Sequence, residues 1–538
     1  MLISGRSRAA GPAQLGTLLD AAAQRHPHSV VVVDRPGDVQ PSRTCTLDYA
    51  RWAGSVEKLS GELMAAGVEP WDRVAIMKAN HPDVLDLSLA SARLGAIPAH
   101  LAWTLAPEVA QTLLKRLDRP VLVTDRKRLQ SCGLDDQNLA TLTKRTIVLD
   151  ADEEGDSGLN QFQGAAVPSP APRRPNEPMA ITHTSGTTGI PKLVVHSAQT
   201  VGTWSRYERR RVPVIRISSD DTVAFCDPYF HARLLTGLVG IAENGPKLVL
   251  MSDPDPATAR GVLSAHRPTM MSTVPNVFLY WEPLAEDPSE PFVNVRLFFN
   301  TYDAIHVRTV RKFLHASRRK LPVWVQAWGQ SETGPVAIGV YTRRSASRRD
   351  RQTSLTQPGG WPVALETRLR AVDPETGQAL PHGRPGLLEV RRQACLDYVG
   401  ERERYLRKRR KQWWNTGDLG VVTWLGTVRV IDREVDRIDG GSCIETEDRL
   451  LDRLEQVTEA IVLSVQGEHP VAIVSTVSGE PPEEEAWQAA TGDLPKLAGP
   501  IVICWHDFPR TATWKVERHK LRAWLLPETA KTGSGYWT

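Results

Sequence analysis

Residues 181–195 read Ile-Thr-His-Thr-Ser-Gly-Thr-Thr-Gly-Ile-Pro-Lys-Leu-Val-Val, the most informative stretch of the chain. Two glycines, Gly186 and Gly189, lie among hydroxyl side chains, and Lys192 follows them. Such a loop presents backbone N–H groups and hydroxyls to a polyphosphate, and the lysine adds a point charge. It is not a Walker A loop, because the pattern G-x-x-x-x-G-K-S/T is absent. The stretch predicts a nucleotide-binding loop, with an ordinary turn between two strands as the alternative.

Strands and helices are expected to alternate on the N-terminal side of this loop. Apolar spacing predicts a strand at 30–33 between two helices that lie within 14–66. Further expected elements are a strand beginning at Arg73, a helix within 82–101 that is closed by Gly95 and followed by a short strand, and strands at 121–125 and 146–150. This order predicts an α/β fold with a mostly parallel, doubly wound sheet. A Pro-rich stretch at 167–178 is expected to be an extended connector.

Composition limits the classes of partner. The 538 residues are 41% hydrophobic and 24% charged, which predicts a large globular protein of several domains. The 66 Lys and Arg residues nearly balance the 62 Asp and Glu residues, so we expect no nucleic-acid partner. One strongly basic run, Arg402–Lys411, predicts a solvated surface segment, with a docking patch for an acidic partner or a phosphate as the alternative.

The sequence also predicts a cytoplasmic protein without a membrane partner. Its six cysteines are far apart and never form a C-x-x-C pair, so neither a zinc site nor a disulfide framework is expected. The N-terminal residues lack the apolar region of a signal peptide, and no run of about eighteen apolar residues occurs.

Five further motifs follow the loop in order. They are Pro228-Tyr229-Phe230-His231, Trp328-Gly329-Gln330-Ser331-Glu332-Thr333, Trp414-Asn415-Thr416-Gly417-Asp418, Asp432-Arg433, and Pro509-Arg510-Thr511-Ala512-Thr513-Trp514-Lys515. Together with Thr184–Lys192 they resemble the motif series of the AMP-forming, or adenylate-forming, acid-activating superfamily. This superfamily includes acyl-CoA and aryl-CoA ligases, amino-acid adenylation domains and beetle luciferases. The wording is closest to the acyl-CoA and aryl-CoA ligases, and the resemblance covers nearly the whole chain.

The resemblance implies two domains of unequal size. A large N-terminal AMP-binding domain, residues 1–432, should contain doubly wound mixed sheets and a small barrel-like subdomain. A small, mobile α+β cap, residues 433–525, should carry the catalytic lysine and turn between half-reactions. The remaining residues, 526–538, are expected to be a disordered tail.

The resemblance also implies a role for individual residues. The expected catalytic residues are Lys515, which would bridge the substrate and the α-phosphate, Glu332, which would hold Mg²⁺, and His231, which would lie beside the substrate carboxylate. Thr184 is a second candidate for the metal. The expected nucleotide-binding set is Thr184, Ser185, Gly186, Thr187, Thr188, Gly189, Lys192, Trp328, Gly329, Gln330, Ser331, Asp418, Arg433 and Lys515, with Asp418 on the ribose hydroxyls. The expected substrate-binding residues are His231, Tyr302 and Asp303.

Three tryptophans near the motifs, and several positions that differ from the family pattern, bear on the residue roles that the resemblance implies. For Trp328, Trp413 and Trp414, packing is the stronger interpretation, although Trp328 lies where the family places an aromatic ring near adenine. Trp514 replaces the glycine before the catalytic lysine, and Val435 occupies the polar hinge position. The loop 438–447, with Gly440 and Gly441, is one or two residues shorter than usual, and Thr301-Tyr302-Asp303-Ala304 replaces Gly-Gly-Ala. These changes leave adenylation intact and put the CoA step in question.

The leading functional hypothesis is an ATP- and Mg²⁺-dependent ligase that adenylates a small aromatic or acyl acid and passes it to CoA. One alternative keeps the adenylation and uses another acceptor: a carrier protein, an amine, or, with nitrite as the activated species, an arylamine that becomes diazotised. A second alternative is a degenerate nucleotide-binding relative without catalysis. An amino-acid substrate is disfavoured, because the Pro-x-Phe-His wording follows the acyl and aryl ligases even though Asp227 lies near the place where adenylation domains carry an aspartate.

Overall fold

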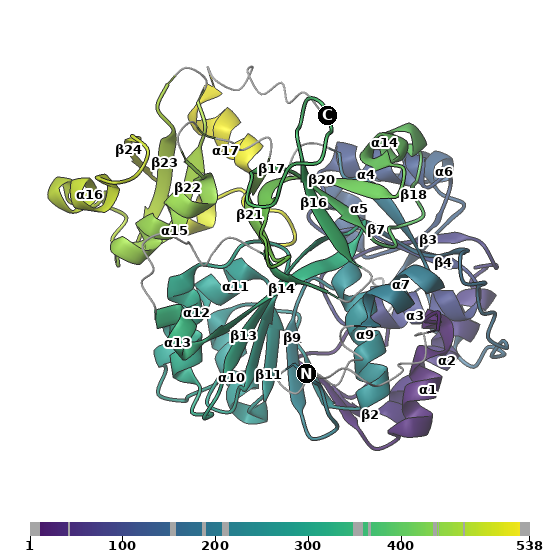
Figure 1. Cartoon of the computed structure of the whole chain (residues 1–538). Coiled ribbons are helices and arrows are strands. Elements are labelled where there is room, and N and C mark those ends of the chain that lie inside the picture. The colour runs from purple at the N-terminus through teal and green to yellow at the C-terminus, as the bar shows by residue number, and fades with distance from the viewer. Residues whose placement is uncertain are drawn as a thin grey trace.

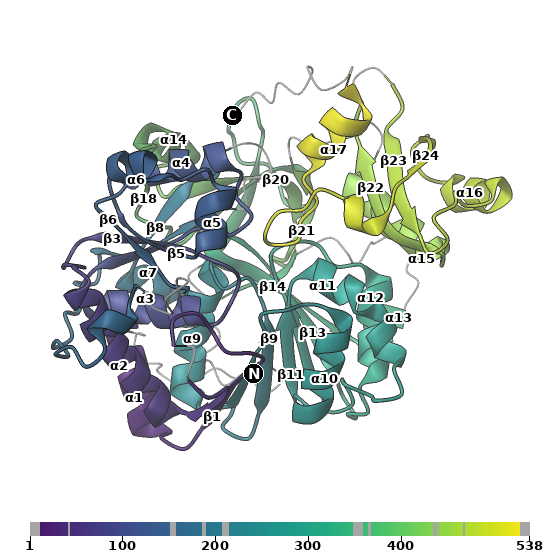
Figure 2. The same cartoon turned by 180° about the vertical axis from the view of Figure 1, so that it is seen from behind.

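The computed structural model describes residues 11–40, 43–150, 158–184, 190–206, 215–347, 359–363, 367–433, 438, 441–465 and 468–527. The described strands form one sheet of fourteen strands, one of seven and one of three. The two larger sheets and their helices form the main body of the molecule, and the small sheet lies beside α11 and α12 in both views (Figures 1 and 2). The expected α/β architecture is confirmed.

The seven-stranded sheet carries the loop predicted to bind a nucleotide. Its order is β18-β8-β7-β4-β3-β5-β6. The bounds are β3 Arg73–Met77, β4 Ile97–His100, β5 Val121–Thr124, β6 Arg145–Val148, β7 Pro178–His183, β8 Leu193–Ser197 and β18 Asp397–Tyr398. The pairs from β6 through β5, β3 and β4 to β7 are parallel, whereas the pairs β7–β8 and β8–β18 are antiparallel. The loop therefore connects the hairpin strands β7 and β8.

The fourteen-stranded sheet has a parallel and an antiparallel part. Its order is β16-β17-β20-β21-β15-β14-β13-β12-β11-β9-β10-β1-β2, with β19 beside β20. The bounds are β1 Val30–Val33, β2 Thr46–Asp48, β9 Thr222–Cys226, β10 Lys247–Leu250, β11 Met270–Thr273, β12 Leu297–Asn300, β13 Val323–Gln330, β14 Gly334–Thr342, β15 Gly359–Pro362, β16 Arg368–Val372, β17 Gly386–Arg391, β19 Arg409–Arg410, β20 Trp413–Val422 and β21 Val428–Arg433. The antiparallel strands at the β16 end correspond to the expected barrel-like subdomain, and their described residues do not close into a barrel.

Helices cover both faces of the parallel strands. Alternate strand residues point to opposite faces, so Val223 and Phe225 of β9 belong to a core shared with α9, whereas Ala224 belongs to a core shared with α10, α11 and α12. The helices of the main body are α1 Leu18–Arg25, α2 Tyr49–Ala65, α3 Asp83–Arg93, α4 Pro107–Arg116, α5 Arg126–Ser131, α6 Asp136–Leu142, α7 Ala198–Trp204, α9 Ala232–Asn244, α10 Pro256–His266, α11 Pro275–Tyr280, α12 Val307–Ala316, α13 Arg343–Ser347 and α14 Arg402–Lys408.

The C-terminal part forms its own small α/β unit. Its strands are β22 Val457–Leu463, β23 Val471–Thr476 and β24 Ala498–Val502, and its helices are α15 Cys443–Arg453, α16 Glu484–Thr491 and α17 Arg518–Leu525. Two apolar clusters cover the two faces of this sheet. Arg308 of α12 donates from Nη1 to the backbone oxygens of Leu451 and Val457, at 2.9 and 2.8 Å, and so ties the unit to the main body. The boundaries at 432 and 525 stay predictions.

Several local expectations are confirmed. The strand at 30–33 lies between α1 and α2, and the segment 164–174 has no regular structure before β7 begins at Pro178. The basic run forms α14 and β19, with mostly exposed or half-exposed basic side chains, while its Tyr405 is buried against Trp414. No helix in the described ranges is long and apolar enough to cross a membrane.

Candidate active site

The two ends of the predicted nucleotide-binding loop are held together. The backbone N–H of Thr184 donates to the Lys192 carbonyl at 3.0 Å, and the Lys192 N–H donates to Thr184 Oγ1 at 3.1 Å. Ser185, Gly186, Thr187, Thr188 and Gly189, between these ends, lie outside the described residues. The structure therefore places Thr184 and Lys192 at the base of the loop.

Lys192 meets the carboxylate expected to hold the metal. Its Nζ lies 3.8 Å from Glu332 Oε1, and the Tyr398 hydroxyl donates to the same oxygen at 2.5 Å. Burial and the charge of Glu332 raise the pKa of Tyr398, so its hydroxyl stays protonated as the donor. Tyr398 could not be predicted, because the two-residue strand β18 is too short to be recognised in the sequence. An anionic side chain that faces the phosphate loop is a suitable ligand for Mg²⁺, which binds through carboxylates and phosphate oxygens.

Asp418 is oriented by two residues of the Trp328–Thr333 motif. Trp328 Nε1 and Gln330 Nε2 both donate to Asp418 Oδ2, at 3.1 and 3.3 Å. Gln330 also bonds to the Thr416 carbonyl at 2.6 Å. Trp328 is buried in an apolar cluster, in accord with the packing interpretation. These contacts bring two sequence-distant motifs to one place, with Asp418 held as an acceptor for donors such as ribose hydroxyls.

Close backbone packing explains the glycine of that motif. A Cβ on Gly329 would lie 2.2 Å from the Gly334 carbonyl oxygen, where β13 bulges. Ser331 follows in the turn between β13 and β14. Arg433 pairs through its backbone with Asp418, and its side chain lies outside the described residues.

Gln326 is a buried polar residue beside the Trp328–Thr333 motif that the sequence analysis did not single out. It is 1% exposed, and neither amide atom has a hydrogen-bond partner within the described ranges. Its side chain points to the same side of β13 as that of Trp328, two residues later. A buried amide with an unused donor and acceptor suits a ligand edge that offers both, as adenine does. The detectable signal is a polar residue inside the otherwise apolar run Val323–Trp328.

His231 caps helix α9 and contacts Tyr302. Its Nδ1 accepts from the Arg233 N–H at 3.1 Å, and its ring centre lies 4.4 Å from that of Tyr302. Burial lowers the pKa of His231 to about 3, with the charge of Lys515 as the second cause, so the imidazole is neutral. Asp303, in contrast, is exposed and accepts from the neighbouring Ala304 N–H. Of the two predicted substrate residues after β12, only Tyr302 reaches this site.

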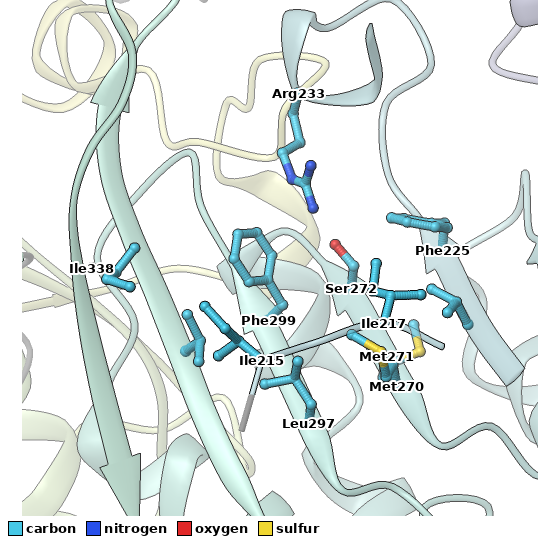
Figure 3. A pocket seen from close by; sticks show the side chains of 12 residues that line it. Ile215, Ile217, Phe225, Arg233, Met270, Met271, Ser272, Leu297, Phe299 and Ile338 are labelled. Atoms are coloured by element: carbon cyan, nitrogen blue, oxygen red, sulfur yellow. The ribbon is translucent and has the colours of Figure 1, made fainter. Parts of the chain in front are cut away.

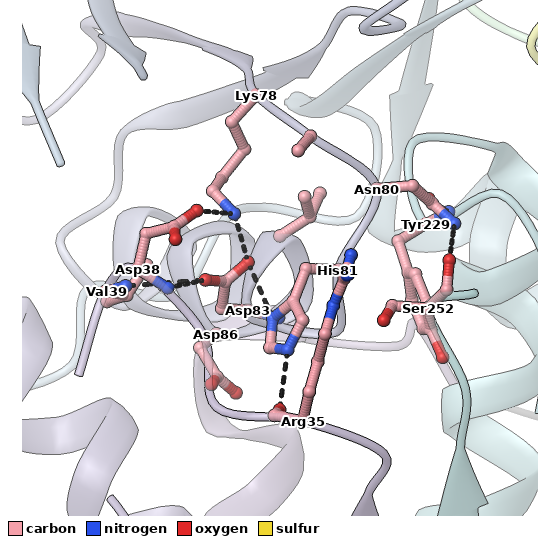
Figure 4. Close-up of polar contacts among 12 residues, drawn as sticks. Arg35, Asp38, Val39, Lys78, Asn80, His81, Asp83, Asp86, Tyr229 and Ser252 are labelled. Atoms are coloured by element: carbon pink, nitrogen blue, oxygen red, sulfur yellow. Dashed lines mark hydrogen bonds and ion pairs between the residues drawn. The ribbon is translucent and has the colours of Figure 1, made fainter. Parts of the chain in front are cut away.

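A polar network positions the segment that carries His231. Lys78, after β3, bonds to Asp38 and Asp83 at 2.8 and 2.9 Å (Figure 4). Two residues later, Asn80 Oδ1 accepts from the Tyr229 N–H at 2.9 Å. The Pro228–His231 segment is thus bonded directly to the end of β3 in the other sheet.

His183, just before the loop, is a third residue that the sequence analysis did not single out. Its ring stacks on Phe230 at 5.0 Å, Nδ1 donates to the Thr184 carbonyl at 2.6 Å, and Nε2 accepts from the Ala102 N–H at 3.0 Å. Burial lowers the pKa of His183 to about 4. The ring is therefore neutral, and its two bonds connect the base of the loop to the main body.

Lys515 lies on a hairpin that docks onto the main body. Arg510 and Val516 pair as an antiparallel bridge, and the Thr511 N–H donates to the Lys515 carbonyl at 2.9 Å. Ala512 at the turn packs with Ala102 and Phe230. The charge of Lys515 lowers the pKa of His231, so the lysine faces the site formed by the large domain.

Trp514 takes part in the same docking. Its φ is +62°, the left-handed conformation that a glycine adopts without strain. Its ring stacks with Tyr280 at 6.0 Å, and its carbonyl accepts from Asn276 Nδ2 at 2.7 Å. Trp505 stacks on the same tyrosine at 4.7 Å. Val435 and Gly440, the other departures near the cap, lie outside the described residues, and Gly441 bridges to Ile438.

Comparisons with known proteins show the family of the chain. A family model described as AMP-binding enzyme matches residues 19–396. The chain is 37% identical to a 3-amino-2-hydroxy-4-methoxybenzoate diazotase of Streptomyces cremeus over 97% of both chains. It is 27% identical to an indoleacetate–CoA ligase of Aromatoleum aromaticum, over 92% of this chain and 98% of the relative.

Two solved structures show the same fold. The anthranilate CoA ligase AuaEII, in complex with anthranoyl-AMP, superposes with a TM-score of 0.79 at 18% identity, over 97% of this chain and 98% of that chain. ATP-bound MatB from Rhodopseudomonas palustris superposes with a TM-score of 0.78 at 22% identity, over 95% of this chain and 98% of that chain. The chain belongs to the family of AMP-binding enzymes, and it is a member of the adenylate-forming group that the motif series predicted.

Proposed function

We propose that this enzyme is an ATP-dependent diazotase that activates nitrite as a mixed anhydride with AMP and transfers its nitrogen to an amino-substituted aromatic acid. The observation that carries the proposal is the 37% identity with a diazotase over 97% of both chains, against 27% for the indoleacetate–CoA ligase. The proposal keeps the adenylation half of the leading sequence hypothesis and replaces its acceptor.

The described residues supply what the first half-reaction requires. Asp418 would bind the ribose, Gln326 the adenine edge, and Lys192 the phosphates, with Glu332 as the protein ligand of Mg²⁺. Mg²⁺, when bound, neutralises phosphate charge. Lys515 would attract the incoming anion and the α-phosphate toward each other, and groups already fixed in place lower the barrier without reorganisation. His231, being neutral, adds no charge that would compete with the lysine for the anion.

The proposed chemistry balances without an oxidant or a reductant. A nitrite oxygen bonds to the α-phosphorus, and the bond to pyrophosphate breaks. The amine nitrogen then attacks the nitrite nitrogen, and AMP leaves with the bridging oxygen. The remaining nitrite oxygen takes up both amine protons and departs as water, which leaves the aryl diazonium ion.

A second candidate function is the transfer of an activated aryl acid to CoA. It is favoured by the Pro-x-Phe-His wording and by the likeness to the indoleacetate–CoA ligase. The contacts of Trp514 disfavour transfer to CoA, because the contacts with Tyr280 and Asn276 would have to break if the cap turned for a second half-reaction. Amines and carrier proteins as acceptors of an activated acid lack a specific observation of this kind.

Pyrophosphate release from ATP separates the two candidates. Purified protein is mixed with ATP, Mg²⁺ and an aminohydroxybenzoate, with either nitrite or CoA, at about pH 8, where spontaneous diazotisation is slow. We expect pyrophosphate release to require nitrite, and the diazonium ion to be trapped as an azo dye with a naphthol. Release that requires the acid and CoA, with a thioester product and no dye, would establish the ligase instead. The Lys515→Ala variant serves as the negative control for either product.

A further inference from the structure

A cavity lies between α9 and the parallel part of the large sheet (Figure 3). Most of its lining is apolar and comes from β9, β11, β12 and β13, including Phe225, Met270 and Phe299. Arg233 and Ser272 are its polar lining residues, and Figure 3 shows them pointing toward one another at one end. An apolar space with a few polar groups at one end suits an aromatic ring with a polar substituent.

Asp227 stands directly behind this polar end. It follows the last residue of β9, and alternation places it on the same face as Val223 and Phe225, which both line the cavity. Its Oδ2 accepts from the hydroxyl of Ser272 at 2.9 Å. The carboxylate thus adjoins the cavity through a residue that lines it.

One oxygen of this carboxylate lacks a hydrogen-bond partner among the residues that the structure describes. Asp227 is 1% exposed, and its Oδ1 has no hydrogen-bond partner in the described part of the chain. A buried acceptor without a donor is destabilising, and more so when it is charged, so such groups are rare in folded proteins. An oxygen held in this state next to a cavity fits a site whose missing donor comes with the ligand.

We propose that Asp227, held by Ser272, accepts a hydrogen bond from the amino group of an aminoarene whose ring fills the cavity. The inference rests on the proposed function, since it identifies the amine of the substrate as the group that is recognised. Burial raises the pKa of Asp227 to about 6, while the charge of Arg233 opposes the shift, so near pH 8 the group is a carboxylate that only accepts. Asp227 would then select aminoarenes over aryl acids without the amine.

Calorimetric binding of 3-aminobenzoate and benzoate, a pair that differs only in the amine, tests this site. We expect the wild type at pH 8 to bind 3-aminobenzoate at least about tenfold more tightly, the effect of one hydrogen bond to a charged acceptor. Asp227→Leu should reduce the ratio of affinities to about one, and Asp227→Asn, which keeps the shape and loses the charge, should give an intermediate ratio. Asp136→Asn, an exposed change on α6, is the matched control.

An unchanged ratio in folded Asp227→Leu would overturn the inference, as would a wild type that binds both ligands equally. If Asp227→Leu fails to fold, Asp227→Asn decides, and a ratio equal to that of the wild type overturns the inference. Because binding is measured without nitrite, the two proposals fail separately. Amine selection through Asp227 without diazonium formation would reject only the proposed function, and diazonium formation with no role for Asp227 would reject only this site.

Discussion

Two parts of the candidate site are built in different ways. The nucleotide half, formed by Thr184, Lys192, Glu332 and Asp418, consists of polar groups that follow the family motifs and are joined by hydrogen bonds and an ion pair. The lysine hairpin, residues 510–516, contacts the main body through the ring of Trp514, a departure from those motifs that stacks with Tyr280, and also through a hydrogen bond from Asn276 and the packing of Ala512 on Phe230. The first kind of contact fixes charges, and the second fixes the position of a whole hairpin.

The difference follows from what each part must do. A polyphosphate requires charges and donors at set places, because electrostatic stabilisation falls off when a group is misplaced. A docked hairpin needs only sufficient contact area in the correct place, and different side chains can supply it. We therefore expect substitutions in the charged groups to affect the chemistry strongly, and substitutions in the aromatic contact to have smaller, graded effects.

The largest effect is expected for Lys515, the charged residue that the hairpin carries. Lys515→Ala should lower the rate of AMP formation by about 10²–10³-fold, the usual effect of removing one fixed electrostatic group. The measurement is pyrophosphate release under saturating ATP. Lys520→Ala, an exposed lysine of α17, is the matched control and should keep the wild-type rate. Equal rates for Lys515→Ala and the wild type would remove the lysine from the site.

Glu332 tests the nucleotide half directly. Glu332→Gln should reduce AMP formation by about 10²-fold, because the neutral amide binds Mg²⁺ weakly. Raising the Mg²⁺ concentration should recover part of the rate, which distinguishes a metal ligand from a purely structural residue.

Tyr398 provides the graded comparison for this residue. Tyr398→Phe removes only the donor to Glu332 and should lower the apparent Mg²⁺ affinity by about tenfold, the size expected for a partner of a metal ligand. A Glu332→Gln variant whose residual rate is indifferent to Mg²⁺ would contradict the assignment.

Sequence reasoning reached the fold and most of the charged groups, for a physical reason. Strand and helix periodicity is local, so β1, β3 to β6 and their helices could be predicted, and the order of the motifs linked Lys192, Glu332 and Asp418 before any distance was known. Gln326 and Asp227 could not be assigned, because what marks them is that buried polar atoms of their side chains have no hydrogen-bond partner among the described residues, which only the folded structure shows. Tyr398 and His183 were not predicted for a related reason, since each acts through contacts with residues distant in sequence.

The pH dependence of the free energy of unfolding tests whether His183, at the base of the loop, is neutral in the folded protein. With a folded pKa of about 4 and an ordinary value of 6.5, His183 binds its proton in the unfolded state first as the pH falls. Its contribution is therefore present above pH 6.5 and is lost toward pH 4, by about 1.4 kcal/mol per pH unit, or tenfold in the unfolding equilibrium. Urea unfolding of His183→Gln between pH 6.5 and 4.5 should show a slope smaller by this amount.

The exposed His28→Gln is the control for this titration and should keep the wild-type slope. His100, whose pKa burial also lowers to about 4, is present in all three proteins, so its own titration contributes to each of the three slopes. A slope that is identical in His183→Gln and the wild type would mean that the histidine does not stay neutral in the folded protein.

The smallest effect is expected for Trp514→Gly, which tests directly whether the aromatic contact of the hairpin matters less than the charged groups of the nucleotide half. Glycine relieves the left-handed backbone, a strain of about 1–2 kcal/mol, but removes a ring that stacks with Tyr280 and lies tilted against Trp505, with about 0.5–1.5 kcal/mol for each aromatic pair. The domain should remain as stable, while the hairpin loses the ring contact with Tyr280 of α11 and keeps the backbone hydrogen bond from Asn276. We expect AMP formation to fall by about two- to tenfold, with unchanged affinity for ATP.

Tyr280→Ala should reproduce the loss of rate without relieving the strain, and Trp524→Ala, on the exposed side of α17, should change nothing. Combining Trp514→Gly with Tyr280→Ala should then add little beyond the loss of the Trp505–Tyr280 contact, because both variants remove the Trp514–Tyr280 contact. If the two losses multiplied instead, Trp514 and Tyr280 would act independently, and the aromatic stack would not be what holds Lys515 toward the nucleotide half. A less-than-multiplicative result would mean that the position of the catalytic charge depends on a contact that the family motifs do not contain.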